Sequence, residues 1–136
     1  MNLIICLDDQ GGMTFFGKRQ SMDSALRNKA LELAGEERLW MDVYSAGQFA
    51  EYSDRIFVDE DYLQNAPQNA WCFAERIQPE SVLSQVDKLA IFRWNRLYPS
   101  DKKFTIDLAQ VGAKLSSRED FVGTSHPNIT LEVYLL

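Results

Sequence analysis

The chain has 136 residues, a length that fits one domain, residues 1–136, with one hydrophobic core. Hydrophobic residues make up 46% and charged residues 25%, which is typical of a globular protein and excludes a disordered chain. Acidic residues outnumber basic ones by 20 to 14, a net charge of -6. This charge argues against a nucleic acid or an anionic membrane surface as the partner, whereas a small anionic ligand needs only a few local cations.

The N-terminal segment predicts a buried first strand. Residues 3–7 are apolar, but the run ends at Asp8 and Asp9 and lacks the basic start and the length of a signal peptide. No apolar run approaches the ~20 residues of a membrane span. The two cysteines, Cys6 and Cys72, each lie in an apolar run and are expected to be free thiols. We therefore expect a cytoplasmic protein with no membrane partner.

Strands and helices alternate over the first ninety residues. A loop over residues 8–20 holds three glycines, and the helix after it is expected to begin at Ser21 as N-cap and to end at Gly35. The remaining signals predict strands at 39–43, 55–58 and 71–74, and helices at 45–52, 59–65 and 79–86. Such alternation is typical of right-handed crossovers and a mostly parallel sheet.

The last third of the chain predicts strands without helices. These strands are expected at residues 88–96, 104–108, 114–121 and 129–135, with a hairpin connection at 123–128. The fold class is therefore α/β. We expect a single domain with a central, mostly parallel mixed β-sheet, helices on both faces and a C-terminal antiparallel hairpin. The apolar residues 133–136 predict either a paired strand or a subunit contact in a homo-oligomer.

One stretch near the N-terminus is more informative than the composition. It runs from Asp8 to Gly17 and is followed by an acidic residue, Asp23, near the start of the expected helix. This pattern resembles the dihydrofolate reductases, in which a glycine-containing substrate loop precedes a helix whose Asp or Glu faces the pterin. Later segments also resemble that family, in order: Trp40-Met41, Ser45, Phe49, residues 87–91, Ser100-Asp101, Phe104, residues 118–121 and residues 131–134. The resemblance implies a dihydrofolate reductase-like fold with Asp23 beside the pterin.

The positions that would bind a dinucleotide depart from the family pattern. Asp42 and Val43 stand where the family has a Gly-Arg pair, and an aspartate there would repel a phosphate. Residues 74–76 (Ala-Glu-Arg) replace a glycine-rich turn, so side chains would block a close approach of the backbone to a pyrophosphate. Phe92 replaces a threonine beside the pterin. NADPH is therefore disfavoured, and the cofactor stays unknown.

Each candidate site residue also has an ordinary structural explanation. Asp23, the candidate catalytic residue, would bind an amidine-like edge and relay a proton, or would simply stabilise the first turn of the helix. Lys18 and Arg19 would hold an anion, or lie in a solvated loop. Aromatic side chains would stack on a flat ligand, or pack in the core. The full set of candidate ligand-binding residues is Gly12, Met13, Phe15, Phe16, Lys18, Arg19, Trp40 and Phe92.

Three hypotheses of function follow. The first is a small-molecule-binding protein that does not use a nicotinamide dinucleotide in the usual way, with a flat heterocycle or a nucleotide fragment as ligand. The second is an active NADPH-dependent pteridine reductase. The third is a structural or interaction protein that has lost the site. A metal site is not expected, because His126 is the sole histidine.

Overall fold

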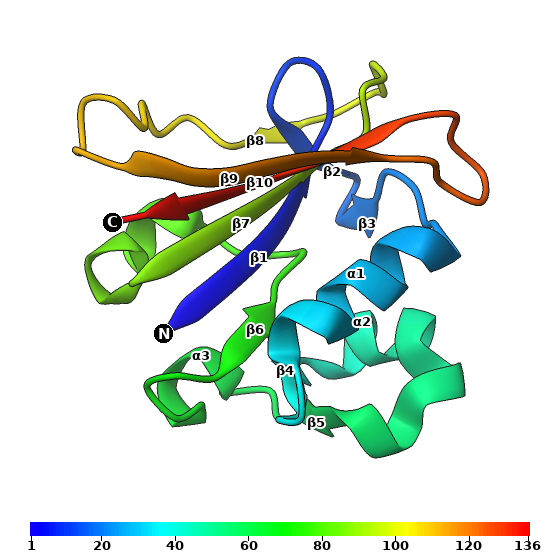
Figure 1. Ribbon diagram of the computed structural model, residues 1–136, viewed down its shortest axis with the longest axis vertical. Coiled ribbons are helices and arrows are strands. Elements are labelled where there is room, and N and C mark those ends of the chain that lie inside the picture. Colours follow the sequence, from blue (N-terminus) through cyan, green and yellow to red (C-terminus); the bar gives the residue numbers. More distant parts are fainter.

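A seven-stranded β-sheet forms the centre of the molecule (Figure 1). The structure is a computed structural model and describes residues 1–136. The strand order across the sheet is β5 (Ile56–Val58), β4 (Leu39–Met41), β6 (Trp71–Phe73), β1 (Asn2–Leu7), β7 (Lys88–Arg93), β10 (Ile129–Leu135) and β9 (Lys114–Phe121). The first five are parallel, and β10 and β9 form the antiparallel hairpin. The predicted α/β fold, with its mostly parallel sheet and closing hairpin, is therefore confirmed.

Strand β1 is central because both of its faces are covered by apolar side chains. Leu3 pairs with Cys72 of β6 on one side and with Leu89 of β7 on the other. Ile4 faces a core cluster that includes Leu26, and Leu3 faces a second cluster on the opposite face of the sheet. The unbroken apolar run that predicted a buried strand is what a strand covered on both faces requires.

Helices cover both faces of the sheet. The elements are α1 (Ser24–Ala34), α2 (Val43–Ala46), α3 (Tyr62–Asn65) and the 3-10 segments η1 (Gly47–Arg55), η2 (Pro79–Ser81) and η3 (Leu83–Gln85). Side chains of α1 pack in the cluster with Ile4, whereas Tyr62 of α3 packs in the cluster with Leu3. None of these helices has the length and apolar character to cross a membrane.

A small second sheet lies across one end of the large one and contains much of the expected loop over residues 8–20. Its order is β3 (Lys18–Arg19), β2 (Gly12–Phe15) and β8 (Lys102–Lys103). The β2–β3 turn has Phe16 at φ 51° and Gly17 at φ 70°. Two successive positive φ values are typical of the tight hairpin turn whose twist matches the flanking strands. We call residues 12–19 the β2–β3 hairpin.

Several predicted boundaries are wrong for local reasons. Asp23, not Ser21, is the N-cap of α1, because the Asp23 carboxylate accepts the backbone N–H of Ala25 and Leu26. The helix predicted at 45–52 begins earlier, because Asp42 caps α2 at Val43, and it passes into 3-10 turns instead of a longer α-helix. The helix expected at 79–86 is two 3-10 turns. No strand forms at 104–108, and the second sheet takes residues 102–103 instead.

Candidate functional site

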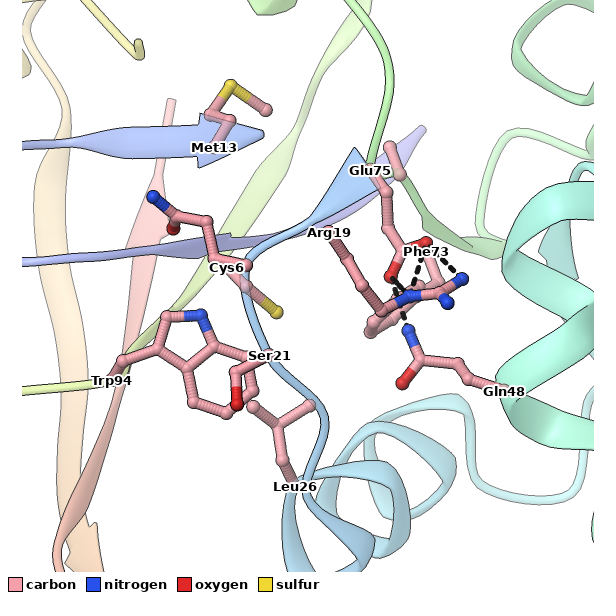
Figure 2. Close-up of a pocket in the computed structure, with 11 residues that line it drawn as sticks. Cys6, Met13, Arg19, Ser21, Leu26, Gln48, Phe73, Glu75 and Trp94 are labelled. Atoms are coloured by element: carbon pink, nitrogen blue, oxygen red, sulfur yellow. Dashed lines mark hydrogen bonds and ion pairs between the residues drawn. The ribbon is translucent and has the colours of Figure 1, made fainter. Parts of the chain in front are cut away.

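A cavity lies at the carboxyl ends of β1 and β6, between the β2–β3 hairpin, α1 and η1 (Figure 2). Its lining residues are Cys6, Met13, Arg19, Gln20, Ser21, Leu26, Gln48, Phe73, Ala74, Glu75 and Trp94. The cavity measures about 350 Å³ when its mouth is included, but only about 10 Å³ is open to the centre of a water molecule. It therefore has room for about one water molecule while the β2–β3 hairpin stays in this position.

A partly buried ion pair closes one side of this cavity. Arg19 Nε donates to both carboxylate oxygens of Glu75, at 2.9 and 3.2 Å, and Arg19 Nη2 donates to Glu75 Oε2 at 2.9 Å. The same carboxylate accepts from Ser45 Oγ at 3.1 Å and from the Gln48 side-chain amide. Figure 2 shows Arg19, Glu75 and Gln48 meeting on one side of the cavity. Two parallel hydrogen bonds between a guanidinium and a carboxylate fix the relative orientation of the two groups as well as pairing their charges.

Tyr44 holds the β2–β3 hairpin from the other side of Arg19. The Arg19 backbone N–H donates to Tyr44 Oη at 2.8 Å, and Arg19 Nη2 donates to the Tyr44 carbonyl at 3.0 Å. The guanidinium carbon lies 4.2 Å from the centre of the Tyr44 ring. Burial lowers the pKa of Arg19, but the Glu75 carboxylate raises it by more. The Arg19–Glu75 ion pair thus joins the β2–β3 hairpin to the turn after β6.

Asp23 joins α1 to the loop between β9 and β10. Its Oδ1 accepts the backbone N–H of Ala25 and of Thr124, both at 2.9 Å. Its Oδ2 accepts the Ser125 N–H at 2.8 Å and lies 3.0 Å from His126 Nδ1. Burial raises the pKa of Asp23, but these hydrogen bonds outweigh burial and hold it well below its usual range. Asp23 is therefore ionised at neutral pH.

The His126 ring stands between Asp23 and two hydroxyl groups. Its Nε2 is 3.2 Å from Ser21 Oγ and 2.8 Å from Tyr98 Oη. The ring stacks on Trp94, with 4.6 Å between ring centres, and is 3% exposed. The sequence places His126 in the hairpin connection at 123–128 and does not indicate this contact. The 103 residues that separate His126 from Asp23 leave no local signal.

Cys6 also lines the cavity but is unsuited to act as a nucleophile. Burial raises the pKa of its thiol, and the nearby Glu75 carboxylate raises it further. Because the thiolate is the reactive form, Cys6 stays an inert thiol at neutral pH. Burial likewise raises the pKa of Cys72 to about 11.

Carboxylates lie at the positions where the family resemblance would place the phosphates of a dinucleotide. At the start of α2, the Asp42 side chain accepts the Ser45 N–H at 2.8 Å, and the Glu60 side chain accepts the Val43 N–H at 2.7 Å. After β6, Glu75 is 9% exposed and turns inward. An anion placed at either position would lose these amide donors and meet negative charge. These residues do not fit NADPH held in the way the resemblance implies.

The structure distributes the expected ligand-binding residues over several places. Met13 and Arg19 line the cavity, whereas Phe15, Phe16 and Lys18 line an open groove with Arg19, Gln20, Tyr98 and Pro99. Trp40 stacks on Phe57 at 4.1 Å between ring centres, and Phe92 is fully buried in the core. Gly12 packs so closely that an added Cβ would lie 2.7 Å from Asp8 Oδ2. Asp23 is not among the residues that line the cavity.

Compared by sequence, the chain matches no known protein family and no curated protein. Compared by structure, it is similar to a dihydrofolate reductase from Enterococcus faecalis, described as complexed with NADP(H) and RAB-propyl. The two are 14% identical, the similarity covers 98% of this chain and 94% of that one, and the TM-score is 0.68. The dihydrofolate reductase-like fold implied by the sequence resemblance is therefore confirmed, and the low identity fits a divergent relative.

Proposed function

We propose that this chain is a small-molecule-binding protein that does not act as a conventional NADPH-dependent reductase. The ligand would be a flat heterocycle or a nucleotide fragment. The observation that carries the proposal is the cavity at the carboxyl ends of β1 and β6, closed by the Arg19–Glu75 pair. In open α/β sheets, ligands bind outside the carboxyl ends of the strands, where few polar groups converge on an apolar lining.

Binding requires the β2–β3 hairpin to move. With room for about one water molecule, the cavity cannot admit a ring while Arg19 stays on Glu75. The Arg19 contacts to Glu75 and Tyr44 fix the end of the hairpin, and β3 has only two residues. A ligand that binds the open form better shifts the population toward it. Opening would expose Phe73 and Trp94 as flat walls and Glu75 and Gln48 as polar partners.

The reductase alternative is disfavoured by charge. The Enterococcus faecalis enzyme is described as complexed with NADP(H). In this chain, Asp42, Glu60 and Glu75 take the amide and guanidinium donors that a phosphate would need. A reductase would have to hold its cofactor through other residues.

The test is thermal unfolding with NADPH, dihydrofolate, folate and a panel of nucleotides. A ligand at 100 times its Kd stabilises by ~2.7 kcal/mol, or roughly 9 °C for a chain of this length. We expect a shift with a heterocycle or nucleotide and none with NADPH. A shift with NADPH, followed by turnover of dihydrofolate, would contradict the proposal.

Two variants locate the ligand. Arg19→Ala should strengthen binding in the cavity, because it removes the side chain that keeps the cavity closed. Lys18→Ala is the matched control, since Lys18 lines the open groove and not the cavity. Weakened binding in Lys18→Ala, with no gain in Arg19→Ala, would place the ligand in the groove instead.

A second candidate is a structural or interaction protein, favoured by the small free space in the cavity. No shift in Tm with any ligand, in the wild type or in Arg19→Ala, would support this second candidate over ligand binding.

The free thiols of Cys6 and Cys72 support the prediction that the protein is located in a reducing compartment such as the cytoplasm.

A further inference from the structure

We propose that Ser21, His126 and Asp23 form a nucleophile, base and orienting carboxylate that transfer small acyl groups from carboxylic esters. Ser21 and His126 would be the catalytic residues, and Asp23 a positioning residue. The set would act in the cavity of the proposed function and needs the same opening of the β2–β3 hairpin, but it rests on hydroxyl and imidazole geometry and not on the binding of a heterocycle. Such sets are recognised by geometry and roles, and not by position in the sequence.

The three side chains are connected in the order that the chemistry needs. Asp23 Oδ2 lies 3.0 Å from His126 Nδ1, and His126 Nε2 lies 3.2 Å from Ser21 Oγ. Nucleophile and base are thus within hydrogen-bond reach, and the base is oriented by a third group.

The ionised carboxylate determines which ring nitrogen of His126 carries the proton. Because Asp23 Oδ2 accepts hydrogen bonds only, Nδ1 donates its proton to it. In the neutral ring, Nε2 then presents a lone pair, which is the form of histidine that accepts a proton from a hydroxyl. Stacking on Trp94 and burial to 3% exposure hold the ring in this orientation.

Ser21 faces the cavity, so a substrate could meet its hydroxyl. It lies in the segment just before α1 and is one of the lining residues, together with apolar Leu26 and Trp94. Figure 2 shows Ser21 on the side of the cavity with Trp94 and Leu26, away from Glu75. The cavity has room for about one water molecule, so an ester reaches Ser21 only when the β2–β3 hairpin opens, and a short acyl chain needs the smallest opening. The class of substrate is therefore short-chain carboxylic esters.

The step balances without a cofactor. Ser21 Oγ attacks the ester carbonyl carbon while its proton passes to His126 Nε2. The carbon–oxygen bond to the alcohol breaks, and the alcohol leaves with the proton from Nε2. Water, activated in the same way, then attacks the acyl-serine, which releases the carboxylic acid and restores Ser21.

Two features make the expected reaction slow. Tyr98 Oη lies 2.8 Å from Nε2 and competes with Ser21 for its lone pair. The side-chain amides of Gln20 and Gln48, which could stabilise an oxyanion, already donate to Asp8 and Glu75. Loss of one oxyanion donor alone lowers kcat by about 10²–10³-fold in enzymes of this type. We therefore test the nucleophile first and turnover second.

The experiment treats the intact protein with methanesulfonyl fluoride, a serine reagent with a single methyl group, and follows the adduct by mass spectrometry. Ser21 Oγ bonds to sulfur, fluoride leaves and His126 takes the proton. We expect one adduct, on Ser21, that is absent in Ser21→Ala and forms about 100-fold more slowly in His126→Gln. Ser24→Ala is the matched control, because the Ser24 hydroxyl lies 2.5 Å from Thr124 Oγ1 and has no histidine partner. Its labelling should equal that of the wild type.

Access to the cavity is controlled with Arg19→Ala, which opens the mouth. No adduct on Ser21 in either the wild type or Arg19→Ala would overturn the proposal, as would equal labelling of Ser21 and Ser24. Asp23→Asn, confirmed as folded by circular dichroism, should label more slowly than the wild type. A labelling rate unchanged in Asp23→Asn would remove Asp23 from the set. Release of 4-nitrophenolate from 4-nitrophenyl acetate, lost in Ser21→Ala, would extend the result to esters.

Discussion

Two carboxylates, Asp23 and Glu75, each join segments that are far apart in the sequence, but they do so with different partners. Asp23 receives backbone N–H groups of α1 and of the β9–β10 loop, together with the His126 ring. Glu75 receives mainly side chains, above all the Arg19 guanidinium. Backbone donors cannot leave without unfolding a segment, whereas a side chain can. The Asp23 junction therefore lasts as long as the fold itself, whereas the Glu75 junction can open.

The largest expected effect on the free energy of unfolding is at the Asp23 junction. Asp23→Asn replaces one carboxylate oxygen by an amide that meets N–H donors, so at least one buried donor loses its partner. We expect a loss of about 3 kcal/mol, or roughly 10 °C in Tm. The measurement is urea unfolding followed by circular dichroism. In the control, Asp42→Asn at the cap of α2, one oxygen can still accept the Ser45 N–H, and the cost should stay within a few tenths of a kcal/mol. Equal losses in both variants would contradict the comparison.

A double-mutant cycle on Arg19→Ala and Glu75→Ala should give a smaller effect. The pair is partly exposed, with side-chain exposures of 20% and 8%, and its forked geometry is favourable. We expect a coupling free energy of about 1–2 kcal/mol. The exposed Lys29–Glu119 pair is the control and should give ~0.5 kcal/mol or less, weakened further by salt. A coupling near zero at Arg19–Glu75 would show that this pair does not hold the hairpin.

The smallest expected effect is the loss of folding stability at low pH. The pKa values of Asp23 and Asp8 lie below their usual range in the folded protein. As the pH falls through about 4, the unfolded chain therefore takes up protons before the folded one, and stability decreases. We expect Asp23 to account for a loss of about 1 kcal/mol between pH 7 and pH 3. Unfolding curves over this range, compared between the wild type and Asp23→Asn, should show a shallower decrease in the variant. Parallel curves would contradict the assigned hydrogen bonds.

The same comparison explains how much of the molecule the sequence predicted. The continuous apolar run predicted the buried strand β1, and the apolar residues at the start of β10 mark the buried part of that strand. Strand β9 is almost wholly exposed, so burial leaves no such pattern in it. Apolar periodicity did not predict the elements whose local conformation depends on tertiary contacts. The 3-10 turns of η1 and the two-residue strands of the second sheet have no pattern of their own.

The candidate site was predicted less well, for a physical reason. Asp23 was singled out because it resembles the pterin-facing acid of the dihydrofolate reductases, and the structure gives it an N-cap role together with a buried histidine partner. Glu75 and Arg19 are 56 residues apart, and no local pattern predicts that they meet. Asp42 and Val43 marked a poor phosphate site from sequence alone. The Glu60 carboxylate also accepts the Val43 N–H, and this contact depends on the tertiary fold.

The central position of β1 has a consequence for how the chain folds. Its neighbours, β6 and β7, lie about 70 and 86 residues further along the chain, so Asn2 must find Trp71 and Lys88. Closing loops of this length precedes any gain from pairing, and topologies dominated by distant contacts fold slowly. Until β6 and β7 are both in place, the apolar residues of β1 lack at least one of their partner strands. We therefore expect that early folding species expose Leu3 to Leu7 and that this segment sets the tendency of the chain to aggregate during refolding.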